Sequence, residues 1–257
     1  MSFMLENYSW KSARKTFRSK KVALVPVGSM EQHGPHLPLG TDFFIAQALA
    51  ESAARDTGAI CTPGIPIGVS AHHRQFWGTL WVSPQTFRQY VYEAAIGLGY
   101  HGVGGIIFVN GHGGNLPSLQ EISRNLRPEK LYSVVYQWWT DPSVIELLNR
   151  LFKSKGTHAG AMETAMVLAI RPELVDAASY DEAARGAAAE FGIKKFGAEL
   201  PVDTVEFSES GATLDPREAT VEAGKRIFQT ALDSLKSFID WLEKAKADDL
   251  ESQAHRD

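Results

Sequence analysis

The sequence predicts a single α/β domain built on a mainly parallel sheet. Three observations support this prediction: short apolar runs alternate with amphipathic segments, proline and glycine mark the joints between them, and no linker or composition break divides the 257 residues. Strands that alternate with helices favour a parallel sheet, because parallel strands need a crossover connection. We expect one domain over residues 1–246, followed by a disordered charged tail at 247–257.

The individual elements are expected in chain order. Three apolar runs predict strands, at 22–27, 105–109 and 131–138, whereas the proline- and glycine-rich stretch 60–69 leaves room for only a short one. Periodicity or a capping signal predicts helices over 43–55, 83–98, 117–126, from Pro142 onward and over 160–170. Asp215-Pro216 is expected to begin a long last helix that ends near Lys246, and 172–213 shows little usable periodicity.

Composition excludes several classes of protein. A net charge of −4 gives no reason to expect a nucleic-acid or anionic-membrane partner. No segment approaches the roughly 18 apolar residues of a membrane span, and residues 1–21 contain no signal-type apolar run. The single cysteine, Cys61, rules out an internal disulfide, and it has no partner base nearby that would make it a nucleophile. We therefore expect a cytoplasmic protein.

The first motif that carries chemistry directly follows the expected strand 22–27. It places Glu31, His33, His36 and Asp42 within twelve residues, on a loop stiffened by glycine and proline. Carboxylate oxygen and imidazole nitrogen are the ligands that zinc, manganese and iron accept. We interpret Glu31, His33 and Asp42 as metal ligands and His36 as a residue that supports them. The alternatives are a solvated loop and, for Asp42, a helix N-cap.

A second motif, from Asn110 to Asn115, follows the expected strand 105–109. It reads Asn-Gly-His-Gly-Gly-Asn, with His112 at its centre. Since the carboxyl ends of parallel strands line one edge of the sheet, we expect this loop to meet the first. We interpret His112 as a metal ligand supported by Asn110 and Asn115. The alternative is a phosphate-binding loop, which the absence of a following lysine or arginine makes weaker.

Two further groups of residues complete the expected site. His158 precedes the helix 160–170 and Glu163 lies in its first turns, so beside two ligand loops we interpret both as members of the site; the family resemblance described below implies that they are its catalytic pair, with Glu163 also a ligand. The alternative is a capping histidine and an ordinary first-turn glutamate. The donor-rich loop 68–79 suggests substrate binding, as does an aromatic pair at the end of the third strand; the alternative is surface and core packing. The candidate substrate-binding residues are Ser70, His72, Arg74 and Trp139.

Together these motifs resemble the creatininase (creatinine amidohydrolase) family from about Ser9 to about Leu242. The resemblance rests on Gly-Ser-Met-Glu-Gln-His-Gly-Pro-His at 28–36, Thr-Asp at 41–42, the motif at 110–115 and His-Ala-Gly-Ala-Met-Glu-Thr at 158–164. It implies a three-layer α/β/α fold, a binuclear divalent-metal centre, hydrolysis of a non-peptide C–N bond and a homo-oligomer, often a hexamer. The family's pattern puts Glu31 and His33 on different metals, Asp42 between both and His112 on one of them.

Two positions depart from the creatinine-hydrolysing enzymes. Gly114 stands where they carry a metal-binding glutamate, and Ser154 stands where they carry a tryptophan lid. Counting ligands makes Glu163 the replacement for the missing glutamate. The absent lid points away from creatinine itself. The motif at 110–115 is more similar to relatives that act on other substrates, including formamide hydrolases of riboflavin and deazaflavin synthesis and cyclic-ketone hydrolases of inositol breakdown.

The resulting hypothesis is a metal-dependent amidohydrolase that cleaves a cyclic amide or formamide of a small molecule. Two divalent ions (Zn, Mn or Fe), about 3.5–4 Å apart, would supply a metal-bound hydroxide. Glu163 would take the proton of the water, and His158 would stabilise the oxyanion or protonate the leaving nitrogen. Two competing enzyme hypotheses are a formamidopyrimidine-nucleotide deformylase and an inosose hydrolase. Two hypotheses without catalysis are a protein that binds a phosphorylated ligand and a subunit whose metals are structural.

Overall fold

Four parallel strands form the centre of the computed structural model, which describes residues 3–154, 156–245 and 250. Their order across the sheet is β2-β1-β3-β4, so the chain leaves β2 at one edge and returns on the other side of β1. The predicted α/β class with a mainly parallel sheet is confirmed. The strands are β1 (Val22–Val27), β2 (Ile60–Cys61), β3 (Gly105–Asn110) and β4 (Tyr132–Gln137).

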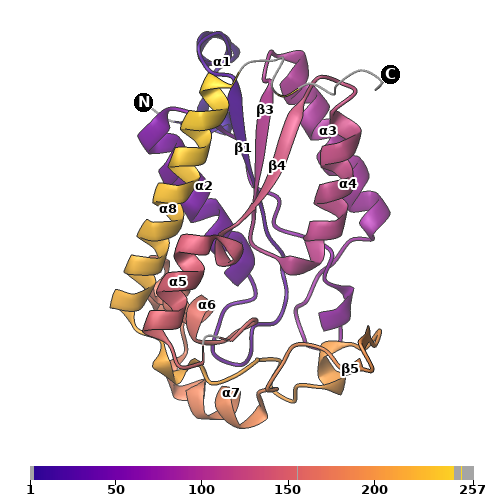
Figure 1. The fold of residues 1–257 in the computed structure, drawn as a ribbon, viewed down its shortest axis with the longest axis vertical. Helices are drawn as coiled ribbons and strands as arrows, with labels where there is room; N and C mark the ends of the chain where they lie inside the picture. Colours follow the sequence, from indigo (N-terminus) through magenta and orange to yellow (C-terminus); the bar gives the residue numbers. More distant parts are fainter. Residues whose placement is uncertain (1–2, 155, 246–249, 251–257) are drawn as a thin grey trace.

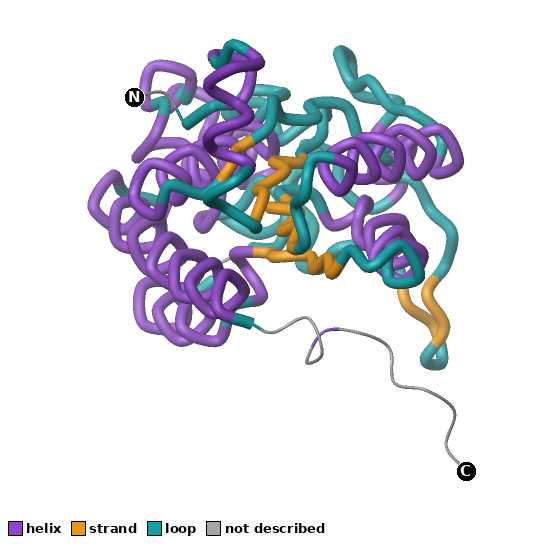
Figure 2. Tube along the Cα trace, turned by 90° about the horizontal axis from the view of Figure 1, so that it is seen from above, coloured by secondary structure: helices purple, strands orange, loops and turns teal. Residues whose placement is uncertain are grey.

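The two central strands are buried on both faces, which explains why they read as continuous apolar runs. Alternate side chains enter two different cores. Leu24 and Ile107 pack on one side of the sheet, and Val25 and Phe108 pack on the other. Both faces therefore need a covering layer, and Figure 2 shows the strands in the middle with helices on either side.

The helices divide between the two faces. Helices α2, α5, α6 and α8 pack together on one side, and α3 and α4 pack on the other (Figure 1). The expected three-layer arrangement is therefore present. The helices are α1 (Trp10–Phe17), α2 (Thr41–Thr57), α3 (Pro84–Tyr100), α4 (Leu116–Leu126), α5 (Pro142–Leu151), α6 (Ala161–Ile170), α7 (Tyr180–Gly186) and α8 (Val221–Lys244). None of the helices in the described residues is both long and apolar enough to cross a bilayer.

The last helix begins later than the sequence suggested. Pro216–Glu218 forms a separate 3-10 turn, and α8 starts at Val221, where the Thr220 hydroxyl accepts a hydrogen bond from the Ala223 amide. The expectation of a start at Asp215-Pro216 was wrong because proline at the first position suits a 3-10 turn as well as an α-helix. The helix ends at Lys244, and the tail 247–257 lies outside the described residues except for Leu250.

Helix α1 was not predicted at all. Ser9 caps it, and its few apolar residues, Trp10, Ala13 and Phe17, share one face, but none of them is fully buried and eight residues are too few for a clear periodicity. The segment 172–213 also holds more structure than expected: helix α7, several 3-10 turns and a small antiparallel hairpin of β5 (Lys194–Lys195) and β6 (Ala198–Glu199). Figure 1 shows α7 and β5 at the end of the molecule opposite α1.

Candidate metal centre

The metal-ligand candidates meet where the loops after β1 and β3 come together. Glu31 and His33 lie on the loop after β1, His112 follows β3, and Asp42 lies in the first turn of α2. β1 and β3 are adjacent parallel strands, and the chain connects them to opposite edges of the sheet. In sheets of this kind the ligand crevice lies at the carboxyl ends of these two strands, where both loops begin. All four side chains are buried.

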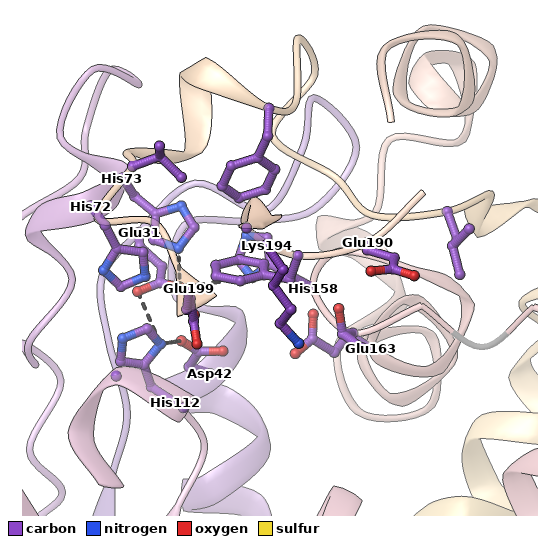
Figure 3. A pocket seen from close by; sticks show the side chains of 18 of the residues that line it. Glu31, Asp42, His72, His73, His112, His158, Glu163, Glu190, Lys194 and Glu199 are labelled. Carbon is purple, nitrogen blue, oxygen red and sulfur yellow. Dashed lines mark ion pairs between the residues drawn. The ribbon is translucent and has the colours of Figure 1, made fainter. Parts of the chain in front are cut away.

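The four residues form two groups that share Asp42. Nδ1 of His112 lies 3.1 Å from Oε2 of Glu31 and 3.2 Å from Oδ2 of Asp42. The other oxygen of Asp42, Oδ1, lies 3.0 Å from Nε2 of His33, which in turn lies 3.8 Å from Oε2 of Glu163. One carboxylate thus faces both groups, as a bridging ligand does. Figure 3 shows Asp42 beside His112.

Backbone carbonyls fix which nitrogen of each imidazole faces the carboxylates. His33 Nδ1 lies 3.1 Å from the Glu31 carbonyl oxygen, His112 Nε2 lies 3.1 Å from that of Val69, and His158 Nε2 lies 2.9 Å from that of Gln32. A carbonyl oxygen can only accept, so each of these nitrogens carries a proton, and the other ring nitrogen is the one that has a lone pair whenever the ring is neutral. This is the tautomer that a metal-binding histidine needs.

Three carboxylate oxygens in the cluster are buried without a hydrogen-bond partner. They are both side-chain oxygens of Glu31 and Oδ2 of Asp42. Their nearest polar neighbours are imidazole nitrogens, so the buried carboxylate charge is balanced only by protons on those rings or by a bound cation. Donor atoms lie within 4.8 Å of one another in three groups: Glu31–Asp42–His112, His33–His158–Glu163 and Glu31–His73–His158. The residues present therefore fit divalent metal ions.

The electrostatics of the cluster also favour positive charge. Burial lowers the pKa of His33, but the charge and hydrogen bond of Asp42 outweigh it and raise that pKa to about 10. Burial also lowers the pKa of His112, but the charges and hydrogen bonds of Glu31 and Asp42 outweigh burial and hold the pKa of His112 well above its usual range. The carboxylates therefore draw protons onto these rings when no cation is bound. The same carboxylates attract a metal ion.

Asp42 does not cap its helix. The N-cap position is Gly40, no side chain caps it, and the oxygens of Asp42 face His33 and His112 instead. Burial opposes ionisation of Asp42, but the neighbouring histidines hold its pKa well below the usual range. The close approach of the second loop to α2 also explains why position 111 is a glycine. A Cβ on Gly111 would lie 2.1 Å from the Asp42 carbonyl oxygen.

Position 114 has no room for a side chain, and Glu163 reaches the cluster from another element. A Cβ on Gly114 would lie 2.4 Å from Nε2 of His112, so a side chain there would displace the ring. Glu163 approaches His33 from the start of α6, and its Oε2 accepts a hydrogen bond of 2.6 Å from the Ala159 amide. Burial raises the pKa of Glu163 to about 7.

The three residues interpreted as support hold the loops together. His36 Nε2 lies 2.9 Å from the hydroxyl of Thr164 in α6, and its other nitrogen has no partner. Asn110 donates to the His112 carbonyl at 2.7 Å. Asn115 donates to the Gly28 carbonyl at 3.0 Å and thereby ties the loop after β3 to the end of β1. All three side chains are buried, and none of them contacts the cluster carboxylates.

The substrate-binding candidates separate into two pairs. His72 and Trp139 line a cavity of about 1020 Å³ that opens onto the cluster. Ser70 does not line it; the buried hydroxyl donates to the Leu80 carbonyl at 3.3 Å. Arg74 does not line it either, because its guanidinium pairs with Asp203 at 2.5 Å.

Two residues of the cavity were missed by the sequence reasoning. Nε2 of His73 lies 3.3 Å from Oε1 of Glu31, and the neighbouring His72 was the only sequence signal for it. Lys194 extends from the β5–β6 hairpin into the cavity (Figure 3). It is the one lysine or arginine among the described residues that line the cavity, and it lies in a segment without periodicity. No sequence signal could have identified Lys194.

Known proteins share both the sequence pattern and the fold. The family model for creatinine amidohydrolase matches residues 6–239. The mycofactocin precursor peptide peptidase of Mycobacterium ulcerans is 33% identical over 227 residues, which cover 84% of this chain and 83% of that protein. The creatinine amidohydrolase of Pseudomonas putida is 27% identical over 235 residues, which cover 85% and 88% of the two chains.

Solved structures agree with these matches. The structure described as "Creatininase Mn" superposes with a TM-score of 0.80 at 25% identity, covering 95% of this chain and all of the other. A creatininase described as of Zn-Zn type gives a TM-score of 0.79 over the same share of the chain. The match to the family model spans both strand-end loops and the start of α6, which together build the cluster. This chain therefore belongs to the creatininase family.

Proposed function

We propose that the protein is a metal-dependent amidohydrolase that holds two divalent cations. Glu31, Asp42 and His112 would hold one, and His33, Asp42 and Glu163 the other. The observation that carries this proposal is the set of partnerless buried carboxylate oxygens facing imidazole nitrogens whose other nitrogen donates to the backbone. When bound, such cations polarise a carbonyl group and lower the pKa of a water molecule.

The chain's own residues would handle the proton of the reaction. Burial lowers the pKa of His158, so the ring is neutral, and its Nδ1 faces the cluster without a proton. Glu163, with a pKa of about 7, is poised to take a proton near neutral pH. We assign Glu163 as the group that accepts the proton of the attacking water. His158 would receive that proton at Nδ1 and pass it to the leaving nitrogen, which regenerates the carboxylate of Glu163.

Two substrate classes compete for this site. The first is a small cyclic amide or formamide, including the formamidopyrimidine-nucleotide and inosose alternatives. The second is a peptide-type amide, which two observations favour: the 33% identity to a peptidase of a precursor peptide, and a cavity of about 1020 Å³, which is large for a single small ring. Lys194 lines the cavity and Arg74 does not, which supports Lys194 as the residue that would contact an anionic substrate group.

We also propose a native metal among zinc, manganese and iron, a homo-oligomeric state and a cytoplasmic location. The donor set of imidazoles and carboxylates accepts all three metals, so supply decides between them. A hexamer is the assembly that the family resemblance implies. Light scattering on the metal-loaded protein measures its mass directly.

The decisive experiment is turnover with added manganese or zinc. The panel comprises creatinine, a formamidopyrimidine nucleotide, a cyclic inosose and short peptides. We expect hydrolysis of at least one of them, abolished by chelator and restored by metal. A metal-loaded protein that is stable but hydrolyses none of them contradicts the proposal and favours structural metals. Stabilisation by a phosphorylated ligand that is indifferent to chelator favours the binding-protein hypothesis.

A further inference from the structure

One aromatic side chain of the segment between α7 and the hairpin stands over the histidines of the site. The ring centroid of Phe191 lies 5.9 Å from that of His158 and 6.0 Å from that of His72, with interplanar angles of 69° and 85°. It also lies 5.1 Å from the ring of Phe207. Edge-to-face packing of this kind fixes the orientation of the ring. Phe191 therefore forms a fixed apolar surface beside the reacting groups.

The neighbours of Phe191 extend this surface into a wall. Leu200, Pro201 and Val202 line the same cavity as the metal-ligand candidates Glu31 and Asp42, and the Leu200 amide donates to the carbonyl of Ile193, two residues after Phe191, at 2.9 Å. The charged side chains of Glu190, Lys194 and Glu199 line the cavity as well. A carbonyl group that reaches the cluster would therefore place its adjoining substituent in a space bounded by apolar side chains. Burial of an apolar substituent there is favourable, whereas a polar one would lose its water without replacement.

The wall is attached to the site by polar contacts. Asp203, directly after Val202, accepts hydrogen bonds from Arg74 and Gln75, each at 2.5 Å. The next residue, Thr204, places its hydroxyl 2.9 Å from Nδ1 of His73. These contacts hold the segment against the loop at 71–75. A preformed wall costs little to organise when a substrate binds.

We propose that Phe191 is a specificity-determining residue, and that the substrate carries a branched aliphatic or aromatic group next to its scissile C–N bond. That group packs against Phe191 and the stretch 200–202. This inference rests on the proposed function, since it concerns the amide that the cluster would cleave. It gives a role to the apolar side chains that line the cavity together with the carboxylates of the cluster.

The test compares two hydroxamates that share a metal-binding head and differ only in a phenyl ring. Acetohydroxamate and phenylacetohydroxamate are titrated calorimetrically into the manganese-loaded protein. We expect the phenyl compound to bind about 10- to 100-fold more tightly. Phe191→Ala should reduce this preference to within about threefold, and Phe191→Leu should keep most of it because leucine retains apolar bulk.

The matched control is Phe196→Ala. Phe196 lies at the tip of the β5–β6 hairpin, which follows Phe191 in the chain. Its side chain is fully exposed and does not line the cavity. It should keep the wild-type preference, and circular dichroism should show all three variants folded. Equal binding of the two hydroxamates to the wild type, or an unchanged preference in Phe191→Ala, overturns the inference alone. Failure of both compounds to bind the metal-loaded wild type overturns the proposed function together with it.

Discussion

Nε2 of His73 faces Oε1 of Glu31 across 3.3 Å, and both atoms are buried. Gln32 determines the tautomer of this histidine. The Gly34 amide donates to Oε1 of Gln32 at 2.9 Å, so the amide nitrogen of Gln32 is the donor that lies 2.8 Å from Nδ1 of His73. The proton of His73 is then on Nε2, toward Glu31. His73 is therefore assigned as a residue that orients a ligand and does not itself bind metal.

This assignment predicts the behaviour of His73→Phe. The variant removes the group that faces Glu31, so we expect about 10- to 100-fold weaker metal binding with an unchanged number of ions at saturation. Calorimetric metal titration measures both quantities. The control is His101→Phe, an exposed histidine outside the cavity. Loss of one whole ion in His73→Phe would show that His73 is a ligand.

Removal of a predicted ligand should lower metal content and activity together. For Glu31→Gln and His112→Ala we expect fewer than the two ions of a binuclear site and a loss of hydrolysis of about 100-fold or more. Mass spectrometry of the purified protein counts the metal, and turnover of the active panel substrate measures the activity. Wild-type metal content in both variants would remove the ligand assignment.

Glu163→Gln distinguishes the two roles assigned to Glu163. If its carboxylate binds metal, the variant loses the ion near His33 and keeps the one near His112. If it acts only as a base, both ions stay and the maximal rate falls by about 100- to 10,000-fold. Because no side chain fits at Gly114, we expect loss of the ion. Retention of both ions with an unchanged rate would exclude both roles.

A methyl group at position 114 should disturb the site through His112. The new Cβ of Gly114→Ala would lie 2.4 Å from both Nε2 of His112 and the Val69 carbonyl oxygen, which share a hydrogen bond. We expect a loss of about 1–3 kcal/mol in the free energy of unfolding, together with weaker metal binding. The control is Gly113→Ala, where a Cβ meets nothing within 4 Å. Equal denaturation midpoints for the two variants would contradict this account.

Cys61 should be inert in the folded protein. Burial raises the pKa of its thiol to about 12, so at pH 8 only about one molecule in ten thousand carries the reactive thiolate. We expect no reaction with a thiol-specific disulfide reagent until denaturant is added, and complete reaction of one thiol per chain afterwards. Rapid labelling of the native protein at pH 8 would show that Cys61 is accessible.

The sequence predicted the sheet well because its central strands are apolar on both faces. It predicted the meeting of the two ligand loops for a general reason: parallel strands present their carboxyl ends at one edge. It failed at α1, which buries no residue, and at Pro216, where a 3-10 turn and a helix start have the same local signal. Periodicity needs an apolar pattern that repeats over several turns, so a helix of eight residues with only three apolar positions escapes it.

The sequence by itself determined which side chains could bind a metal and the two strands after which they would stand. Local residue chemistry and the order of strands suffice for that. Only the tertiary structure decided which nitrogen of each histidine faces the carboxylates, that Arg74 pairs with Asp203 while Lys194 enters the cavity, and that Phe191 stands beside the histidines. These contacts join residues far apart in the chain, and their geometry depends on how the segment after α7 folds back over the sheet edge.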